Sequence, residues 1–91
     1  MEDLKIMIYP VFAVRDNLVG FLRPITEMND AVAMRNFRDA FVQLPEASKS
    51  DYSLFKIGEF NDKTGEVTPL LPTVVCHATD FPEKDGDSDD I

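Results

Sequence analysis

The sequence predicts an α+β fold in which an antiparallel sheet, made of two β-hairpins, packs against one amphipathic helix. Three observations support this prediction. A single stretch of helical periodicity lies between two pairs of strand-forming segments, strands and long helices do not alternate, and 91 residues are enough for one domain only. The predicted order is ββαββ, and a short fifth strand at Thr73–Ala78 is left open.

The first hairpin is predicted from residues 4–25. Residues 4–14 are rich in apolar and β-branched side chains, which favours a strand. Because Pro10 has no backbone N–H, we expect this strand to lie at an edge of the sheet or to break there. Residues 15–18 are typical of a tight turn, and Val19–Ile25 forms the return strand.

The helix is predicted over residues 31–44. Asn29 or Asp30 can accept a backbone N–H of the first turn, and Pro45 stops the helix. Apolar residues recur at helical spacing and form the face that we expect to pack on the sheet. They are Ala33, Phe37, Ala40, Phe41 and Leu44.

The second hairpin follows a polar loop at residues 46–51. Tyr52–Phe60 is the third predicted strand, and Glu66–Leu71 returns after a turn in which Gly65 takes a left-handed conformation. Gly58 lies inside a strand, which indicates a β-bulge or a close approach of two backbones.

Negative charge is concentrated near the C-terminus. The net charge is −8, and residues 80–91 contribute −5 of it through six acidic residues and one lysine. A segment with so few apolar residues buries too little surface to offset the entropy lost on ordering. We therefore expect one domain at residues 1–80 and an acidic disordered tail at residues 81–91, which leaves the cations of the domain free to gather on its surface.

The sequence offers no constellation for catalysis. Cys76 and His77 are neighbours, so in a strand they point to opposite faces and cannot act together. One cysteine and one histidine cannot build a structural zinc site, no phosphate-binding glycine loop is present, and the acidic tail lacks calcium-loop spacing. We predict a non-enzyme without cofactor or metal. No apolar run approaches the ~20 residues of a membrane helix, so we expect no membrane association.

Aromatic and basic residues alternate along the predicted strands. Composition alone favours an ordinary mixed-charge surface, since the body has no net positive charge. Proteins that bind single strands, however, stack bases on aromatic side chains and hold phosphates with nearby cations. The residues that could do so are Tyr9, Phe21, Tyr52 and Phe55 for bases, and Arg23, Arg35, Arg38 and Lys56 for phosphates. The acidic C-terminal segment, which ends in an apolar residue, also resembles the tails of bacterial and phage single-strand DNA-binding proteins.

Two motifs together point to a family. Asn29–Phe37 reads NDAVAMRNF, and Ser53–Val67 reads SLFKIGEFNDKTGEV. In order and spacing they resemble the small non-structural protein of gokushovirus-type microviruses, tailless phages with single-stranded circular DNA genomes. The resemblance covers residues 4–81 and implies a DNA-binding protein of the host cell cytoplasm, with no family active site. Arg35 belongs to the helix motif.

These observations lead to one main hypothesis and one alternative. The main hypothesis is a phage accessory protein that binds single-stranded DNA non-specifically during genome replication or packaging, helped by homodimerisation through an edge strand or exposed apolar surface. The alternative, prompted by the net charge of −8, is a non-enzymatic interaction protein or DNA mimic. It would act on a host factor or in capsid assembly, and the acidic tail could recruit a host or phage protein.

Overall fold

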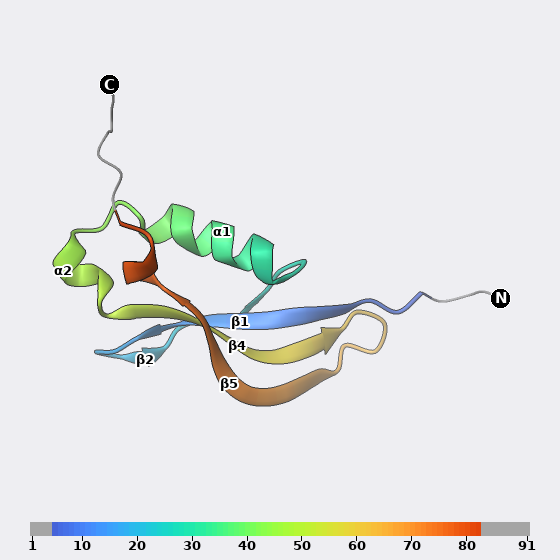
Figure 1. Ribbon diagram of the computed structural model, residues 1–91. Helices are drawn as coiled ribbons and strands as arrows, with labels where there is room; N and C mark the ends of the chain where they lie inside the picture. The colour runs from blue at the N-terminus through green and yellow to red at the C-terminus, as the bar shows by residue number, and fades with distance from the viewer. Residues whose placement is uncertain (1–4, 83–91) are drawn as a thin grey trace, which may run out of the picture.

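The predicted α+β class is confirmed. A computed structural model describes residues 5–82, which form one antiparallel sheet with strand order β2-β1-β4-β5, while β3 also pairs with β1. Helix α1 lies over one face of the sheet (Figure 1). The elements are β1 (Ile8–Asp16), β2 (Gly20–Phe21), β3 (Ile25–Thr26), α1 (Asp30–Phe41), α2 (Glu46–Lys49), β4 (Tyr52–Asn61), β5 (Val67–His77) and a 3₁₀ turn (Ala78–Asp80).

Strand β1 is a central strand, so the prediction that Pro10 places it at an edge or breaks it is wrong. β1 pairs with β4 along its whole length and with β2 and β3 on its other side. The Pro10 carbonyl accepts the backbone N–H of Glu27 at 3.3 Å. In an antiparallel strand the N–H and C=O groups of one residue are directed toward the same neighbouring strand. The carbonyl of Pro10 is directed toward the end of β3, so the N–H that proline lacks would also lie on that side. The hydrogen bonds between β1 and β4 are therefore not interrupted.

The predicted return strand of the first hairpin is two separate pieces, β2 and β3. The turn before β2 is completed by Gly20, whose φ of 120° favours glycine. Asp16 supports this turn by accepting the Leu18 backbone N–H at 2.9 Å through Oδ1. Pro24 lies between the two pieces and has no N–H to continue the pairing, which explains the interruption.

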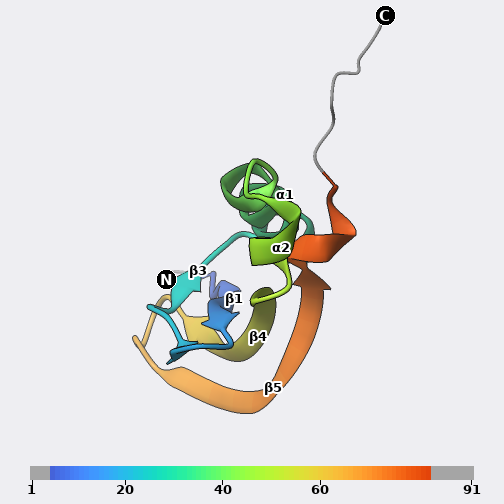
Figure 2. The ribbon, with the colours of Figure 1, turned by 90° about the vertical axis from the view of Figure 1, so that its left-hand side faces the viewer.

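Strand β5 combines the predicted return strand at Glu66–Leu71 and the possible fifth strand at Thr73–Ala78 in one strand. Pro69 pairs with Gly58 and Thr73 with Lys56, so residues 70–72 bulge out beside β4. Prolines are tolerated here because β5 is the last strand of the described sheet. Figure 2 shows β5 bending strongly around the lower side of the sheet. The bulge leaves Leu71 86% exposed.

The core lies between α1 and the sheet. Ala33 and Phe37 of α1 are buried against Phe12, Leu54 and Cys76. The side chain of Asn29 caps the helix by accepting the Val32 N–H at 2.9 Å, as predicted. The helix ends at Phe41, before the predicted end at Leu44, and Pro45 precedes the short helix α2 in the segment predicted to be a loop.

Phe81, the first residue of the predicted tail, is held against the core. Phe81 packs against the core, and its carbonyl accepts a 2.7 Å hydrogen bond from Nζ of Lys49. The Lys49 side chain is fully buried and also lies 3.1 Å from Oε2 of Glu46. A buried ammonium group with two oxygen partners therefore holds Phe81 beside α2. The rest of the predicted tail, residues 83–91, lies outside the described residues.

Replacing Lys49 with methionine tests this attachment. Lys49→Met keeps most of the buried stem but leaves the Phe81 carbonyl without its donor, so we expect a loss of about 1–3 kcal/mol in the free energy of unfolding. Urea denaturation measures this loss. The matched control is Lys63→Met in the exposed β4–β5 turn, which we expect to be neutral; equal stability of both variants would contradict the attachment.

Gly58 tests the close approach of β4 and β5. A Cβ at Gly58 would lie 2.9 Å from the backbone oxygen of Thr68, so Gly58→Ala should destabilise the protein by about 1–3 kcal/mol. Thermal unfolding is the measurement. Gly65→Asn is the control, because Gly65 has a φ of 79° with open space around it and asparagine tolerates that conformation. A Gly58→Ala protein as stable as the wild type would refute the tight approach.

Candidate nucleic-acid interface

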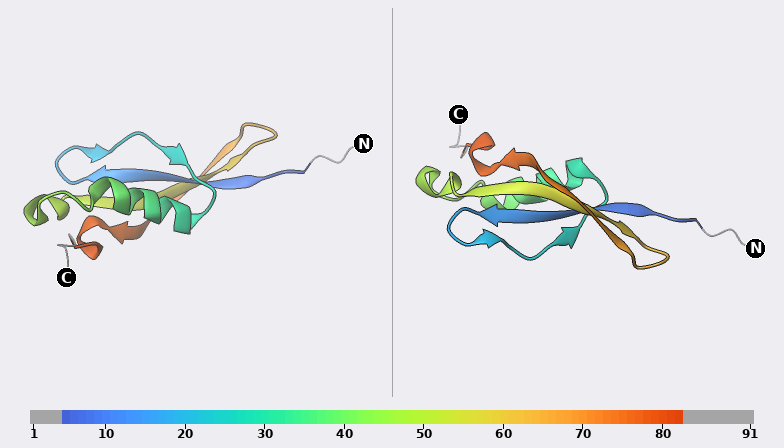
Figure 3. Two further views of the ribbon diagram at one scale, coloured as in Figure 1. Left: turned by 90° about the horizontal axis from the view of Figure 1, so that it is seen from above. Right: turned by 90° about the horizontal axis from the view of Figure 1, so that it is seen from below.

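The sheet has one covered face and one face without a helix. Alternation along β1 puts Phe12 toward α1 and its neighbours away from it. Figure 3, on the right, shows the helix-free side toward the viewer. We call this side the open face. The strand register assigns to it Tyr9, Val11, Ala13, Arg15, Phe21, Ser53, Phe55, Gly58, Phe60, Val67, Pro69, Val74 and His77.

A β-bulge in β4 decides which aromatics share the open face. Val11 pairs with Gly58 but Phe12 pairs with Lys56, so β4 has one extra residue, Ile57. Simple alternation would put Phe55 and Phe60 on opposite faces, since five positions separate them. The bulge shifts the alternation by one and brings both rings to the open face.

An aromatic pair with an adjacent cation forms one end of the open face. The rings of Phe21 and Phe55 meet edge to face, with centroids 5.2 Å apart and an interplanar angle of 82°. The Arg15 guanidinium lies over the Phe21 ring, 5.5 Å from its centroid. Phe21 is 44% exposed, so this cluster presents an aromatic surface and a positive charge to solvent.

The other end of the open face is a shallow apolar hollow. Its volume is about 240 Å³, and it lies between the β2–β3 segment and the start of β5. Phe60 and Val67 form part of its wall, and Tyr9 pairs with Phe60 beside it. Aromatic side chains therefore recur across β2, β4 and β1, from Phe21 at one end to Tyr9 at the other.

The strand residues of the open face include no carboxylate. Its basic residues are Arg15 and His77. Asp16 and Glu59, which lie on the same strands, face the α1 side of the sheet. Nδ1 of His77 lies 2.7 Å from Oγ of Ser53, so these two polar groups are bonded to each other. A polyanion that approaches this face would meet a cation and aromatic rings rather than a like charge.

A comparison with protein families shows to which family the chain belongs. The model of the family described as Phage ORF5 protein matches residues 9–81. The chain belongs to the Phage ORF5 protein family. No curated protein and no solved structure matches it. The match to this family confirms a phage protein.

Some predicted site residues of this Phage ORF5 family member come together and others do not. The open face contains three of the predicted aromatics, and Arg23 is exposed in the segment that follows β2. Those aromatics are Tyr9, Phe21 and Phe55.

The other four predicted residues lie elsewhere. Tyr52 packs into the core against Phe41, with ring centroids 4.9 Å apart. Lys56 is on the α1 side, 3.6 Å from Oδ1 of Asp30. Arg35 and Arg38 are exposed on α1, on the other side of the sheet. The expected gathering of cations on one surface is therefore not observed.

Sequence reasoning missed Arg15 and Phe60. The sequence predicts a turn at Arg15, whereas β1 continues through Asp16 and gives Arg15 a strand position. Phe60 reaches the open face only because of the bulge at Ile57, and the sequence does not show which strand residues the bulge would move. The one available signal was Gly58, which already indicated a bulge nearby.

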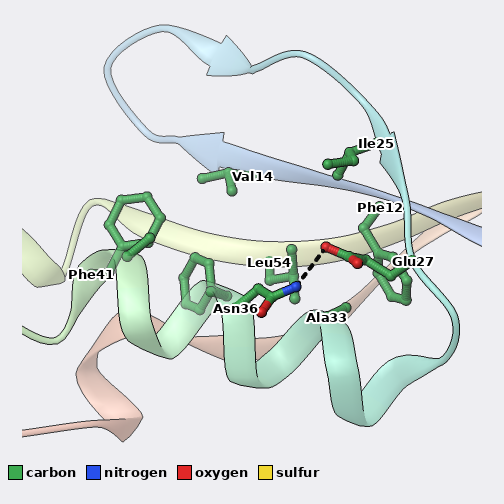
Figure 4. A pocket seen from close by; sticks show the side chains of 10 residues that line it. Phe12, Val14, Ile25, Glu27, Ala33, Asn36, Phe41 and Leu54 are labelled. Atoms are coloured by element: carbon green, nitrogen blue, oxygen red, sulfur yellow. Dashed lines mark hydrogen bonds between the residues drawn. The ribbon is translucent and has the colours of Figure 1, made fainter.

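A second cavity lies on the α1 side of the sheet. Figure 4 shows it between α1 and β1, with Ile25 and Val14 on one wall and Phe41 on the other. Its volume is about 170 Å³ and its lining is almost entirely apolar. The polar contact at its rim is the 3.1 Å hydrogen bond from Asn36 to Glu27. Such a lining suits apolar packing and offers nothing to a phosphate.

Two further features bear on cofactors and membranes. Within residues 5–82, no three histidine, cysteine, aspartate or glutamate side chains lie close enough together to hold a metal ion. None of the helices in this part of the chain is long and apolar enough to cross a membrane. Cys76 is buried in the core, and burial, followed by the nearby Asp80 carboxylate, raises the pKa of its thiol from 9.0 to about 11.

The raised pKa of Cys76 predicts a pH-dependent stability. The thiol is protonated in the folded state, so its contribution is complete below pH 9 and is lost as the pH rises toward about 11. We expect the free energy of unfolding to fall by about 2–3 kcal/mol over this range, and Cys76→Ala to lack this part of the fall. Urea titrations at each pH measure it. Iodoacetamide should label Cys76 at pH 8 only after unfolding; equal labelling of the native protein would contradict a buried thiol.

Proposed function

We propose that this phage protein is a non-enzymatic accessory protein that binds single-stranded DNA, without sequence preference, on its open face. The observation that carries the proposal is the cluster of Phe21, Phe55 and Arg15 on a sheet face with neither a covering helix nor a strand carboxylate. Genome replication or packaging of a single-stranded DNA phage is the setting that the two sequence motifs suggest.

The chemistry of the open face suits a single strand. Unpaired bases stack on aromatic rings irrespective of sequence, because every base has a π-face, and each stack contributes about 1–3 kcal/mol. Phe21 supplies the most exposed ring of the cluster, and Arg15 supplies a cation within reach of the same nucleotide's phosphate. Beyond Phe21, Ala13 and Val11 of β1 are buried, so the further rings that a strand could contact on this face are the half-buried Phe55, Phe60 and Tyr9.

The charge of the chain sets the conditions under which binding is expected. A net charge of −8 repels a polyanion at long range, and few cations lie on the open face. Stacking must therefore contribute much of the affinity, with phosphate contacts adding most at low salt. We expect weak binding that is measurable at low ionic strength and independent of sequence.

Variants on the two faces of one sheet test the proposal. Fluorescence anisotropy of a labelled oligothymidylate at about 20 mM salt measures affinity. Phe21→Leu keeps the apolar contact but removes the ring, and we expect it to weaken binding by roughly 5- to 100-fold. Arg15→Gln should weaken binding and reduce the slope of log K against log salt by about 0.7.

The matched control is Lys56→Gln. Lys56 lies on β4 like Phe55, but on the α1 side, so the same loss of charge should leave the affinity and its salt slope nearly unchanged. Circular dichroism confirms that each variant is folded. If the wild-type protein fails to bind at about 20 mM salt, or if Lys56→Gln weakens binding as much as Arg15→Gln, the open face is not a DNA-binding surface.

The second candidate function is protein interaction, including self-association. It is favoured by exposed apolar side chains on the edge strand β5, above all Val67 at 58% and Leu71 at 86% exposure. Pro69 and Pro72 remove two backbone donors from β5, which disfavours continuous strand pairing there and favours side-chain contacts. Analytical ultracentrifugation of wild type and Leu71→Ser distinguishes the cases: a dimer that Leu71→Ser dissociates supports this function, and a monomer at all concentrations excludes self-association.

A further inference from the structure

Four residues of the open face form a row that runs across the strands of the sheet. Arg15 of β1 pairs with Phe21 of β2 on one side and with Ser53 of β4 on the other. Ser53 in turn pairs with His77 of β5. We call these four residues the cross-strand row. Because neighbouring strands lie ~4.8 Å apart, the row is about 14 Å long from Phe21 to His77.

The polar side chains of the open face are concentrated in this row. The open-face residues outside the row have an apolar side chain or none, except Tyr9 at the other end of β1. Ala13 and Val11, which lie between Arg15 and Tyr9, are buried. A nucleic-acid strand that followed β1 would therefore move away from the groups that can bind phosphate, whereas a strand that crosses the sheet would stay beside them.

The Ser53–His77 pair retains a hydrogen-bond donor that its own contacts do not use. Oγ of Ser53 lies 2.7 Å from Nδ1 of His77, and the His77 side chain also accepts the backbone N–H of Asp80. Because one ring nitrogen is an acceptor, the imidazole carries its hydrogen on the other nitrogen. The hydroxyl and the imidazole then have two donor hydrogens, and the bond between them uses one. In either tautomer, the second hydrogen is left for an incoming acceptor such as a phosphate oxygen.

We propose that single-stranded DNA on the open face crosses the sheet along the cross-strand row, with a base on Phe21, one phosphate on Arg15 and a following phosphate on the Ser53–His77 pair. This inference rests on the proposed DNA binding, and it adds the path of the strand and a second phosphate site. At the ~3.4 Å spacing of stacked nucleotides, a row of this length covers about four nucleotides. A tetranucleotide is therefore long enough to fill the site.

Nuclear magnetic resonance of the full chain, titrated with tetrathymidylate at about 20 mM salt, tests the path. We expect the backbone amide signals of the cross-strand row to shift together, and those of Tyr9 and Phe60 to stay in place. Shifts at Phe21 and Tyr9 without a shift at His77 would overturn the crossing path and leave DNA binding on the open face intact. If no open-face signal moves, both the path and the proposed function are wrong.

Substitutions at the two ends of the open face separate the two paths. His77→Asn keeps an acceptor for the Asp80 N–H, because asparagine is a good N-cap, but it removes the imidazole. We expect this variant to bind tetrathymidylate about 5- to 20-fold more weakly. Tyr9→Leu should leave the affinity nearly unchanged, and circular dichroism confirms that both variants are folded. An affinity that falls with Tyr9→Leu but not with His77→Asn contradicts the crossing path.

The Asp80 carboxylate beside the row provides a second, independent test. Its Oδ2 accepts the His77 backbone N–H at 2.8 Å, so its charge opposes a phosphate at His77. Asp80→Asn keeps an oxygen for this hydrogen bond and removes the charge, so we expect tighter binding of tetrathymidylate. Glu59→Gln is the matched control, since it removes the same charge from an exposed residue on the α1 side of β4. Equal effects of the two variants would refute a phosphate site at His77.

Discussion

The packing of α1 on one face of the sheet is the constraint on which the rest of the structure depends. Phe37 and Ala33 are buried against Phe12 and Leu54, and this contact forms the core of the described domain. A small domain of this kind buries a limited share of its surface, so it can cover one face of its sheet only. The other face is left to its own side chains and to whatever binds there.

The arrangement of the open face follows from this contact and from one bulge. Because β1 is central and regular, its side chains alternate between the two faces of the sheet, and Tyr9 and Arg15 lie on the face away from α1. The extra residue Ile57 in β4 then places Phe60 on the same side as Phe55. Beside this bulge Gly58 lies so close to β5 that a Cβ would come within 2.9 Å of the Thr68 backbone oxygen.

The positive charges are divided between the two sides of the molecule. Arg15 lies on the open face beside Phe21, whereas Arg35 and Arg38 line the outer side of α1. Lys56 pairs with Asp30, and Lys49 is buried where it fixes Phe81. The proposed binding of single-stranded DNA on the open face therefore rests on aromatic surface and on the absence of strand carboxylates there, and not on a collected basic patch.

The sequence by itself determined that one helix lies between strand-forming segments, that Asn29 or Asp30 caps this helix, that Gly65 takes a left-handed turn position and that Gly58 marks a bulge or a close approach, because each depends on local backbone chemistry. It also identified Phe21 and Phe55 as aromatics of one candidate surface. Only the tertiary structure decided that β1 is central despite Pro10, that Tyr52 packs in the core, and that Arg15 joins Phe21. These features depend on which strands pair and in which register, and that depends on contacts between residues far apart in the chain.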